Sequence, residues 1–174
     1  MNKGGTVLFS EKQHFRQVWL WFIILIPTTT LWFQFYNMFK EGVFDKVLII
    51  ICIIAGIGLP ALFYFTNLKT EIISDGIYFC FFPFHLKFHK IALSEIKKYQ
   101  AVTYNPINDC GGWGIRWYGA GGKAYNVSGN RGVKVDLNNG SQILFGSQRP
   151  EEFVLALDKA MEMSPRYHER RPGI

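Results

Sequence analysis

The sequence predicts a membrane protein of the α+β class, in which a hairpin of two transmembrane helices precedes a small β-rich domain closed by a C-terminal helix. Three observations lead to this expectation. Residues 18–38 and 47–66 form two long runs without a formally charged side chain. The residues that follow alternate between polar and apolar side chains with the period of strands, and the last apolar residues recur at helical spacing.

Both uncharged runs have the length of a transmembrane helix. At a rise of 1.5 Å per residue, residues 18–38 would extend about 31 Å and residues 47–66 about 30 Å, close to the hydrocarbon thickness of a bilayer. A cleaved signal peptide does not fit the first run, because its apolar core is too long and a second run follows soon after. The connection over residues 39–45 is short, so we expect an antiparallel hairpin whose two helices contact membrane lipids.

Each run contains a proline, and its neighbours suggest how the lost helix hydrogen bond is offset. Pro27 is followed by Thr28, Thr29 and Thr30, whose hydroxyls could bond the carbonyl that the proline leaves free. Small side chains near Pro60 would let the two helices approach closely; they are Cys52, Ala55, Gly56 and Gly58.

The start of the first helix is predicted from a local motif. Ser10-Glu11-Lys12-Gln13 fits a capping box, in which the side chains of the first and last residue bond free backbone N–H groups. We therefore expect the first helix to begin near Ser10, before the membrane.

The positions of Lys and Arg predict the orientation. Cations lie before the first run and after the second, whereas the cations between the runs are balanced by acidic residues. By the positive-inside rule, both termini and the soluble domain should be cytoplasmic, in a multi-pass protein of the cell membrane. The cations that carry this prediction are Lys3, Lys12, Arg16, Lys69, Lys87 and Lys90.

The sequence from residue 67 onward predicts about seven or eight short strands. Asp75-Gly76 marks a turn between two apolar strands, and Asn139-Gly140 marks a hairpin turn. Residues 85–90 also alternate, which predicts a strand with Leu86 and Phe88 facing inward.

A single helix should close the domain. Pro150 suits its first position, and Glu151 and Glu152 complement the positive end of the helix dipole. The residues expected to pack against the sheet are Phe153, Leu157 and Ala160. We therefore divide the chain into a membrane segment (1–66), a β-rich domain (67–163) and a basic tail (164–174). The domain is large enough for its own core, so a fragment beginning at residue 67 should fold alone.

Several motifs together resemble bacterial pleckstrin-homology-like membrane proteins, a functionally uncharacterised family with an N-terminal two-helix membrane hairpin. The motifs are Phe81-Phe82-Pro83-Phe84-His85, Tyr104-Asn105-Pro106, Gly111-Gly112-Trp113-Gly114-Ile115-Arg116, the segment 125–133, and Gln148-Arg149-Pro150-Glu151-Glu152. The resemblance implies a pleckstrin-homology-like split barrel. Inositide binding is not implied, because the first hairpin, Ile73-Ser74-Asp75-Gly76-Ile77, contains no cation.

Catalytic, metal and cofactor chemistry finds little support in the sequence. Cys52, Cys80 and Cys110 form no CxxC pair, which argues against a disulfide framework or a zinc site. His85 and His89 have no third ligand at a suitable spacing. The glycine-rich segment 119–123 lacks the spacing and the hydroxyl residue of a phosphate-binding loop. No local arrangement suggests a catalytic triad. We therefore expect no enzyme activity, no metal and no cofactor.

A set of polar residues is the candidate interaction patch, because neighbouring strands would bring several of them to one end of the barrel. The set is Arg116, Lys123, Tyr125, Asn126, Arg131 and Arg149. Arg116 and Arg131 could instead hold loop carbonyls.

The expected function is that of a membrane-anchored, non-enzymatic binding module. It would present its domain to a protein partner, as a scaffold or accessory subunit, or assemble as a homo-oligomer. The alternative is a sensor of anionic lipid headgroups, since the chain carries a net charge of +6. No nucleic-acid partner is expected.

Overall fold

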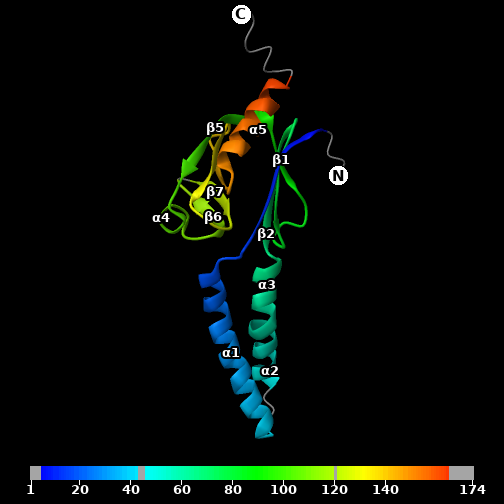
Figure 1. Cartoon of the computed structure of the whole chain (residues 1–174), viewed down its shortest axis with the longest axis vertical. Coiled ribbons are helices and arrows are strands. Elements are labelled where there is room, and N and C mark those ends of the chain that lie inside the picture. Colours follow the sequence, from blue (N-terminus) through cyan, green and yellow to red (C-terminus); the bar gives the residue numbers. More distant parts are fainter. Residues whose placement is uncertain (1–4, 43–45, 120, 165–174) are drawn as a thin grey trace, which may run out of the picture. The chain divides into compact units, whose positions relative to one another are not determined.

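A computed structural model describes residues 5–42, 46–119 and 121–164 (Figure 1). The chain divides into two compact units. One unit is His14–Thr66 and is helical. The other combines the chain up to Gln13 with the chain from Asn67 onward, and its described residues form two β-sheets, two short helices and a longer C-terminal helix. The α+β class expected from the sequence is confirmed.

Among the described residues of the helical unit, one helix is long and apolar enough to cross a membrane. This helix is α1 (Val18–Lys40), which lies near the N-terminus and is consistent with membrane association. The second helical stretch consists of α2 (Lys46–Ile53), the π-helix η1 (Ile54–Gly58) and α3 (Leu59–Phe65). Its apolar part, Ile49–Phe65, is shorter than α1.

The threonines after Pro27 bond different carbonyls from the one expected. Pro27 has no N–H for the carbonyl of Ile23, four residues earlier. The Thr28 hydroxyl donates to the carbonyl of Ile24 at 2.6 Å, and those of Thr29 and Thr30 donate to the carbonyl of Ile26. These hydroxyls thus follow the usual i−3 and i−4 geometry of helical threonines.

Two small residues of the second stretch lie against α1, as expected. Cys52 is 2% exposed, and its thiol lies 3.8 Å from the carbonyl of Leu31. A Cβ on Gly56 would lie only 3.0 Å from Nε1 of Trp32. That indole N–H donates at 3.4 Å to the Gly56 carbonyl. A side chain of α1 therefore hydrogen-bonds the backbone of η1 at the point where the two helical stretches approach closely.

The segment expected to start the first helix is instead a strand. Strand β1 (Val7–His14) hydrogen-bonds to β2 (Asn67–Ile73), and its buried side chains alternate: Phe9, Glu11 and Gln13. The capping-box prediction is therefore wrong, because pairing with a distant strand outweighs the local motif. Residues 7–13 also belong to the β-rich unit, so the expected boundary at residue 66 leaves out its first strand.

The first sheet has the strand order β1-β2-β3-β4. The expected turn at Asp75-Gly76 joins β2 to β3 (Gly76–Phe82), with Ile73 opposite Gly76. Strand β4 (His89–Ala92) starts later than expected. Residues 83–88 form a connection, and Leu86 is 83% exposed, so the prediction that it faces inward is wrong.

The second sheet has the order β5-β8-β9-β7-β6. The expected hairpin at Asn139-Gly140 joins β8 to β9. The bounds are β5 Ile96–Thr103, β6 Gly114–Tyr118, β7 Gly122–Asn126, β8 Arg131–Leu137 and β9 Gln142–Gly146, with the short helices η2 (Leu93–Glu95) and α4 (Pro106–Cys110) between strands. Strands β7 and β9 run parallel, which departs from a simple meander, and the two sheets are not closed into a barrel.

The closing helix α5 (Pro150–Glu162) agrees with the sequence prediction. Pro150 lies in its first turn with Glu151 and Glu152, and Phe153, Leu157 and Ala160 are fully buried. The helix contacts β2 of the first sheet and β5 and β8 of the second. Its Phe153 ring lies 5.3 Å from Phe9 and 6.0 Å from Phe145, so α5 joins β1 to the second sheet in one aromatic core.

Candidate functional site

The six candidate residues do not form one patch. Arg131 pairs with Glu151, and Arg149 pairs with Glu152 at 3.0 Å. Both arginines therefore meet the acidic first turn of α5, where carboxylates also complement the helix dipole. Their charges are largely balanced by these partners.

Arg149 has a further role in holding β1. Its guanidinium donates to the carbonyl of Ser10 at 2.9 Å and lies over the ring of Phe9, 5.0 Å from the centroid. A cation over an aromatic face is attracted by the ring quadrupole. Arg149 therefore fastens strand β1 to the start of α5.

Beside Arg149 lies a buried polar cluster that the sequence prediction missed. The carboxylate of Glu11, 8% exposed, accepts the Ser147 hydroxyl at 2.6 Å and the Gln148 backbone N–H at 2.8 Å. Gln13 donates through Nε2 to the carbonyl of Gly146 at 2.8 Å. Buried polar groups in proteins are normally hydrogen-bonded, and here the partners lie more than 130 residues away in the chain. The cluster positions β1 and is structural.

Asn126 and Tyr125 are also structural. Asn126 is fully buried; its Oδ1 accepts the Gly114 N–H at 2.9 Å, and its amide reaches the carbonyl of Gly112 at 3.4 Å. The Tyr125 ring packs 4.7 Å from Phe79 in the core, and burial raises the pKa of its phenol. Neither side chain is free to bind a ligand at the surface.

The two histidine rings lie close together at a tilted angle but do not form a metal site with a third described group. Their ring centroids lie 4.3 Å apart. Burial, followed by the nearby His89 and Lys123, lowers the pKa of His85, so its imidazole is neutral at pH 7. Accordingly, its Nδ1 accepts the Phe81 N–H at 3.4 Å. Within residues 5–42, 46–119 and 121–164, no group of three His, Cys, Asp or Glu residues could hold a metal ion.

Of the two remaining candidates, Arg116 lies on the edge strand of its sheet and Lys123 lies on the neighbouring strand β7. Strand β6 is last in its sheet and, among the described strands, pairs with β7. Trp117 stands opposite Lys123 and is 73% exposed, and Ile115 is 36% exposed. Arg116 is exposed on the same strand and donates through Nε to the Trp113 carbonyl at 3.0 Å. The sequence indicated both cations, but not the exposed apolar residues beside them.

Comparisons of the chain with protein-family models, curated proteins and solved structures find no match. The resemblance to pleckstrin-homology-like membrane proteins therefore stays a prediction.

Proposed function

We propose that this chain is a membrane-anchored, non-enzymatic binding module. Both helical stretches cross the membrane, and the β-rich unit is presented on the cytoplasmic side to a protein partner. The observation that carries the proposal is the pairing of β1 with β2 from opposite ends of the helical unit.

The pairing supports an even number of membrane crossings. Strand β1 ends at His14, before α1, and β2 begins at Asn67, after α3. Hydrogen-bonded strands of one sheet lie on the same side of a membrane. A crossing by α1 alone would separate them, so the proposal requires a return crossing between Lys40 and Asn67. Residues 46–65 are helical throughout and reach about 30 Å at 1.5 Å per residue, which is enough for the return.

The side of the membrane follows from the cations that flank the helices. Lys12 and Arg16 precede α1 and Lys69 follows α3, which favours the cytoplasm for the β-rich unit. We further propose that the two sheets and α5 form a pleckstrin-homology-like module, since α5 contacts both sheets in the manner of a closing helix.

The edge of β6 is the proposed binding surface, and its occupant is an extended, acidic segment of the partner. An edge strand offers unpaired N–H and C=O groups to an incoming strand. Beside these groups β6 exposes the apolar side chains Ile115 and Trp117, which an incoming strand would cover. Arg116 and the neighbouring Lys123 supply complementary charge for an acidic segment.

A lipid-headgroup sensor is the less favoured proposal. It would need several uncommitted cations around one site, whereas Arg131 and Arg149 are paired with Glu151 and Glu152. The two exposed cations beside β6 lie next to an aromatic edge, which suits a peptide strand better than a headgroup.

The test compares two aspartate substitutions of exposed apolar residues in full-length protein purified in mild detergent. Trp117→Asp should abolish recovery of a stoichiometric partner, because it places a carboxylate where an acidic strand would pair. Leu155→Asp is the matched control, since Leu155 is 65% exposed on α5, and should retain the partner. Co-purification, with cross-links mapped by mass spectrometry, provides the measurement.

The mapped partner segment should be extended and acidic, and Arg116→Glu should also weaken its recovery. Three outcomes would contradict the proposed binding edge. They are recovery of the partner with the Trp117→Asp variant, loss of the partner from both aspartate variants, and the absence of any stoichiometric partner.

A further inference from the structure

We infer that the connection between β3 and β4 is a membrane-contacting loop whose apolar side chains enter the lipid headgroup region. The loop comprises residues 82–88 and exposes Phe82, Phe84 and Leu86 by 41%, 62% and 83%. The inference rests on the proposed two-span topology. It adds a second, peripheral contact with the bilayer, formed by the β-rich unit itself.

The loop is folded so that alternate residues point outward. His85 lies between Phe84 and Leu86 and is held inward: its N–H donates to the Phe81 carbonyl at 2.8 Å, and its carbonyl lies 3.0 Å from the Cys80 thiol. The ring of Phe84 lies 6.0 Å from that of the buried Phe81. The apolar tip is therefore presented by an ordered turn.

Strand register ties this loop to the point where the chain leaves the helical unit. Asn67, the first residue of β2, stands directly opposite Phe82, the last residue of β3. Paired residues of an antiparallel ladder lie about 4.5–5.5 Å apart. Only Thr66 separates Asn67 from the end of α3 at Phe65. Two residues of chain and one strand spacing therefore separate Phe82 from the end of α3, at most about 13 Å, so Phe82 starts close to the membrane if α3 spans it.

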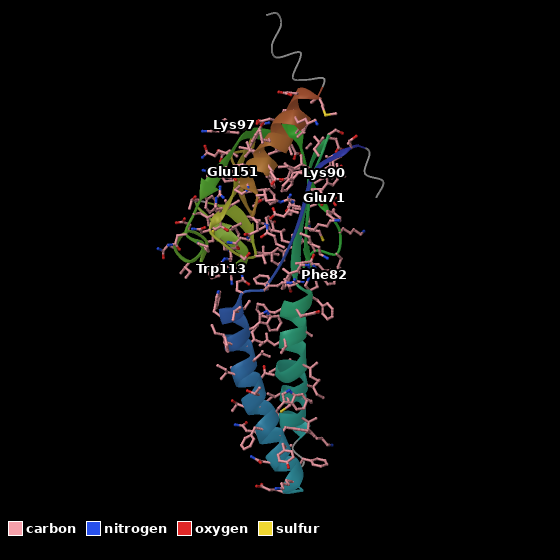
Figure 2. All side chains as sticks on the ribbon, in the orientation of Figure 1. Glu71, Phe82, Lys90, Lys97, Trp113 and Glu151 are labelled. Carbon is pink, nitrogen blue, oxygen red and sulfur yellow. The ribbon has the colours of Figure 1, made fainter. Side chains whose placement is uncertain are left out.

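The interfacial layer is thick enough to receive a loop so close to the span. The headgroup region adds about 5–7 Å on each side of the hydrocarbon core. Exposed Phe and Leu side chains bury at the boundary between headgroups and acyl chains in interfacial membrane segments, and a nearby cation adds attraction to anionic lipids. Lys87 is exposed in the same loop. Trp113 lies toward the same end of the unit as Phe82, whereas Lys97 lies toward the other end (Figure 2).

A lipid surface is favoured over a protein as the occupant because of this connectivity. Phe82 is the strand partner of Asn67, and Leu86 lies four residues further on, so the short connection to α3 keeps all three exposed side chains within reach of the lipid surface if that helix is inserted. A second chain or a protein partner would have to displace that lipid.

The experiment uses full-length protein in lipid nanodiscs with an environment-sensitive NBD fluorophore on single introduced cysteines. Phe84→Cys and Leu86→Cys should give blue-shifted emission that lipids brominated near the headgroup end of the acyl chain quench. Met163→Cys is the matched control: it is 53% exposed, and the C-terminal end of α5 lies at the opposite end of the unit from the start of β2 (Figure 1). Its emission should be neither shifted nor quenched. Labelled wild-type protein reports the background from the native thiols.

A fourth label separates failure of this inference from failure of the proposed topology. Ile54→Cys lies in η1 and is 65% exposed, so a spanning segment requires quenching there by lipids brominated in mid-chain. Quenching at residue 54 without quenching at residues 84 and 86 would overturn the membrane-contacting loop alone. Blue-shifted but unquenched emission at residue 84 would indicate a protein occupant and would also overturn it. Absence of quenching at residue 54 would overturn the proposed two-span topology, and with it the basis of the membrane-contacting loop.

Discussion

A fragment that comprises residues 67–164 should not fold stably, although it contains every strand of the β-rich unit except β1. Loss of β1 exposes the hydrogen-bonding edge of β2. It also removes Phe9 from Phe153 and leaves the Ser147 hydroxyl and Gln148 N–H without the Glu11 carboxylate. Hydrogen bonds to charged groups contribute about 1.5–3 kcal/mol each, so the loss is a large part of the roughly 5–15 kcal/mol that a domain has. Size-exclusion chromatography and thermal circular dichroism should show aggregation or a non-cooperative melt.

Restoring β1 provides the control. Residues 5–14 joined to residues 67–164 through a flexible Gly/Ser linker should give a monomer with a cooperative melt. The same fusion carrying Glu11→Ala should melt at a lower temperature, whereas Lys12→Ala, an exposed neighbour, should not. If the fragment without β1 melts like the fusion, β1 is not part of the stable unit.

The second large effect is expected at the closing helix. Phe153→Ala should lower the free energy of unfolding by about 3–5 kcal/mol, the range for truncating a buried phenylalanine. The side chain is fully buried between Phe9 and Phe145, so its removal opens a cavity that three elements border. Denaturant unfolding of the full chain in detergent, followed by circular dichroism, measures the change.

Leu155→Ala is the matched control on the same helix. Leu155 is 65% exposed, so its truncation should change the free energy of unfolding by less than about 0.5 kcal/mol. Equal effects at positions 153 and 155 would contradict the packing of α5 described above.

Helix α5 could be predicted because its signals are local. Pro150, the acidic residues after it and the spacing of Phe153, Leu157 and Ala160 all lie within one segment, and they agree with one another. The hairpin at Asn139-Gly140 was predictable for the same reason, since two adjacent residues determine the turn.

Strand β1 could not be predicted, because what makes it a strand lies elsewhere in the chain. Two of its three buried residues, Glu11 and Gln13, are polar and gave no apolar alternation. Their partners, Gly146 to Gln148, lie at the end of β9 and just after it, and β2 begins after the entire helical unit. The local capping-box signal was therefore the stronger one in the sequence.

The residues of the candidate patch could be chosen from the sequence by their type. Which of them are exposed and which are held in ion pairs could not be predicted. Arg116 and Lys123 are exposed beside β6, whereas Arg131 and Arg149 are committed to Glu151 and Glu152. Only the tertiary structure brings β8 to the first turn of α5. The exposed Trp117 was equally hidden, because a tryptophan in an alternating strand is usually assigned to the core.

Cysteine accessibility in intact cells tests the central claim of two crossings with a cytoplasmic β-rich unit. Cys110 is a poor reporter, because it is 6% exposed, and burial followed by Asp109 raises the pKa of its thiol. Glu41→Cys and Leu155→Cys, both at exposed positions, replace it. A membrane-impermeant maleimide should label residue 41 in intact cells and residue 155 only after permeabilisation. Labelling of residue 155 in intact cells, or labelling of both positions from the same side, would contradict the account.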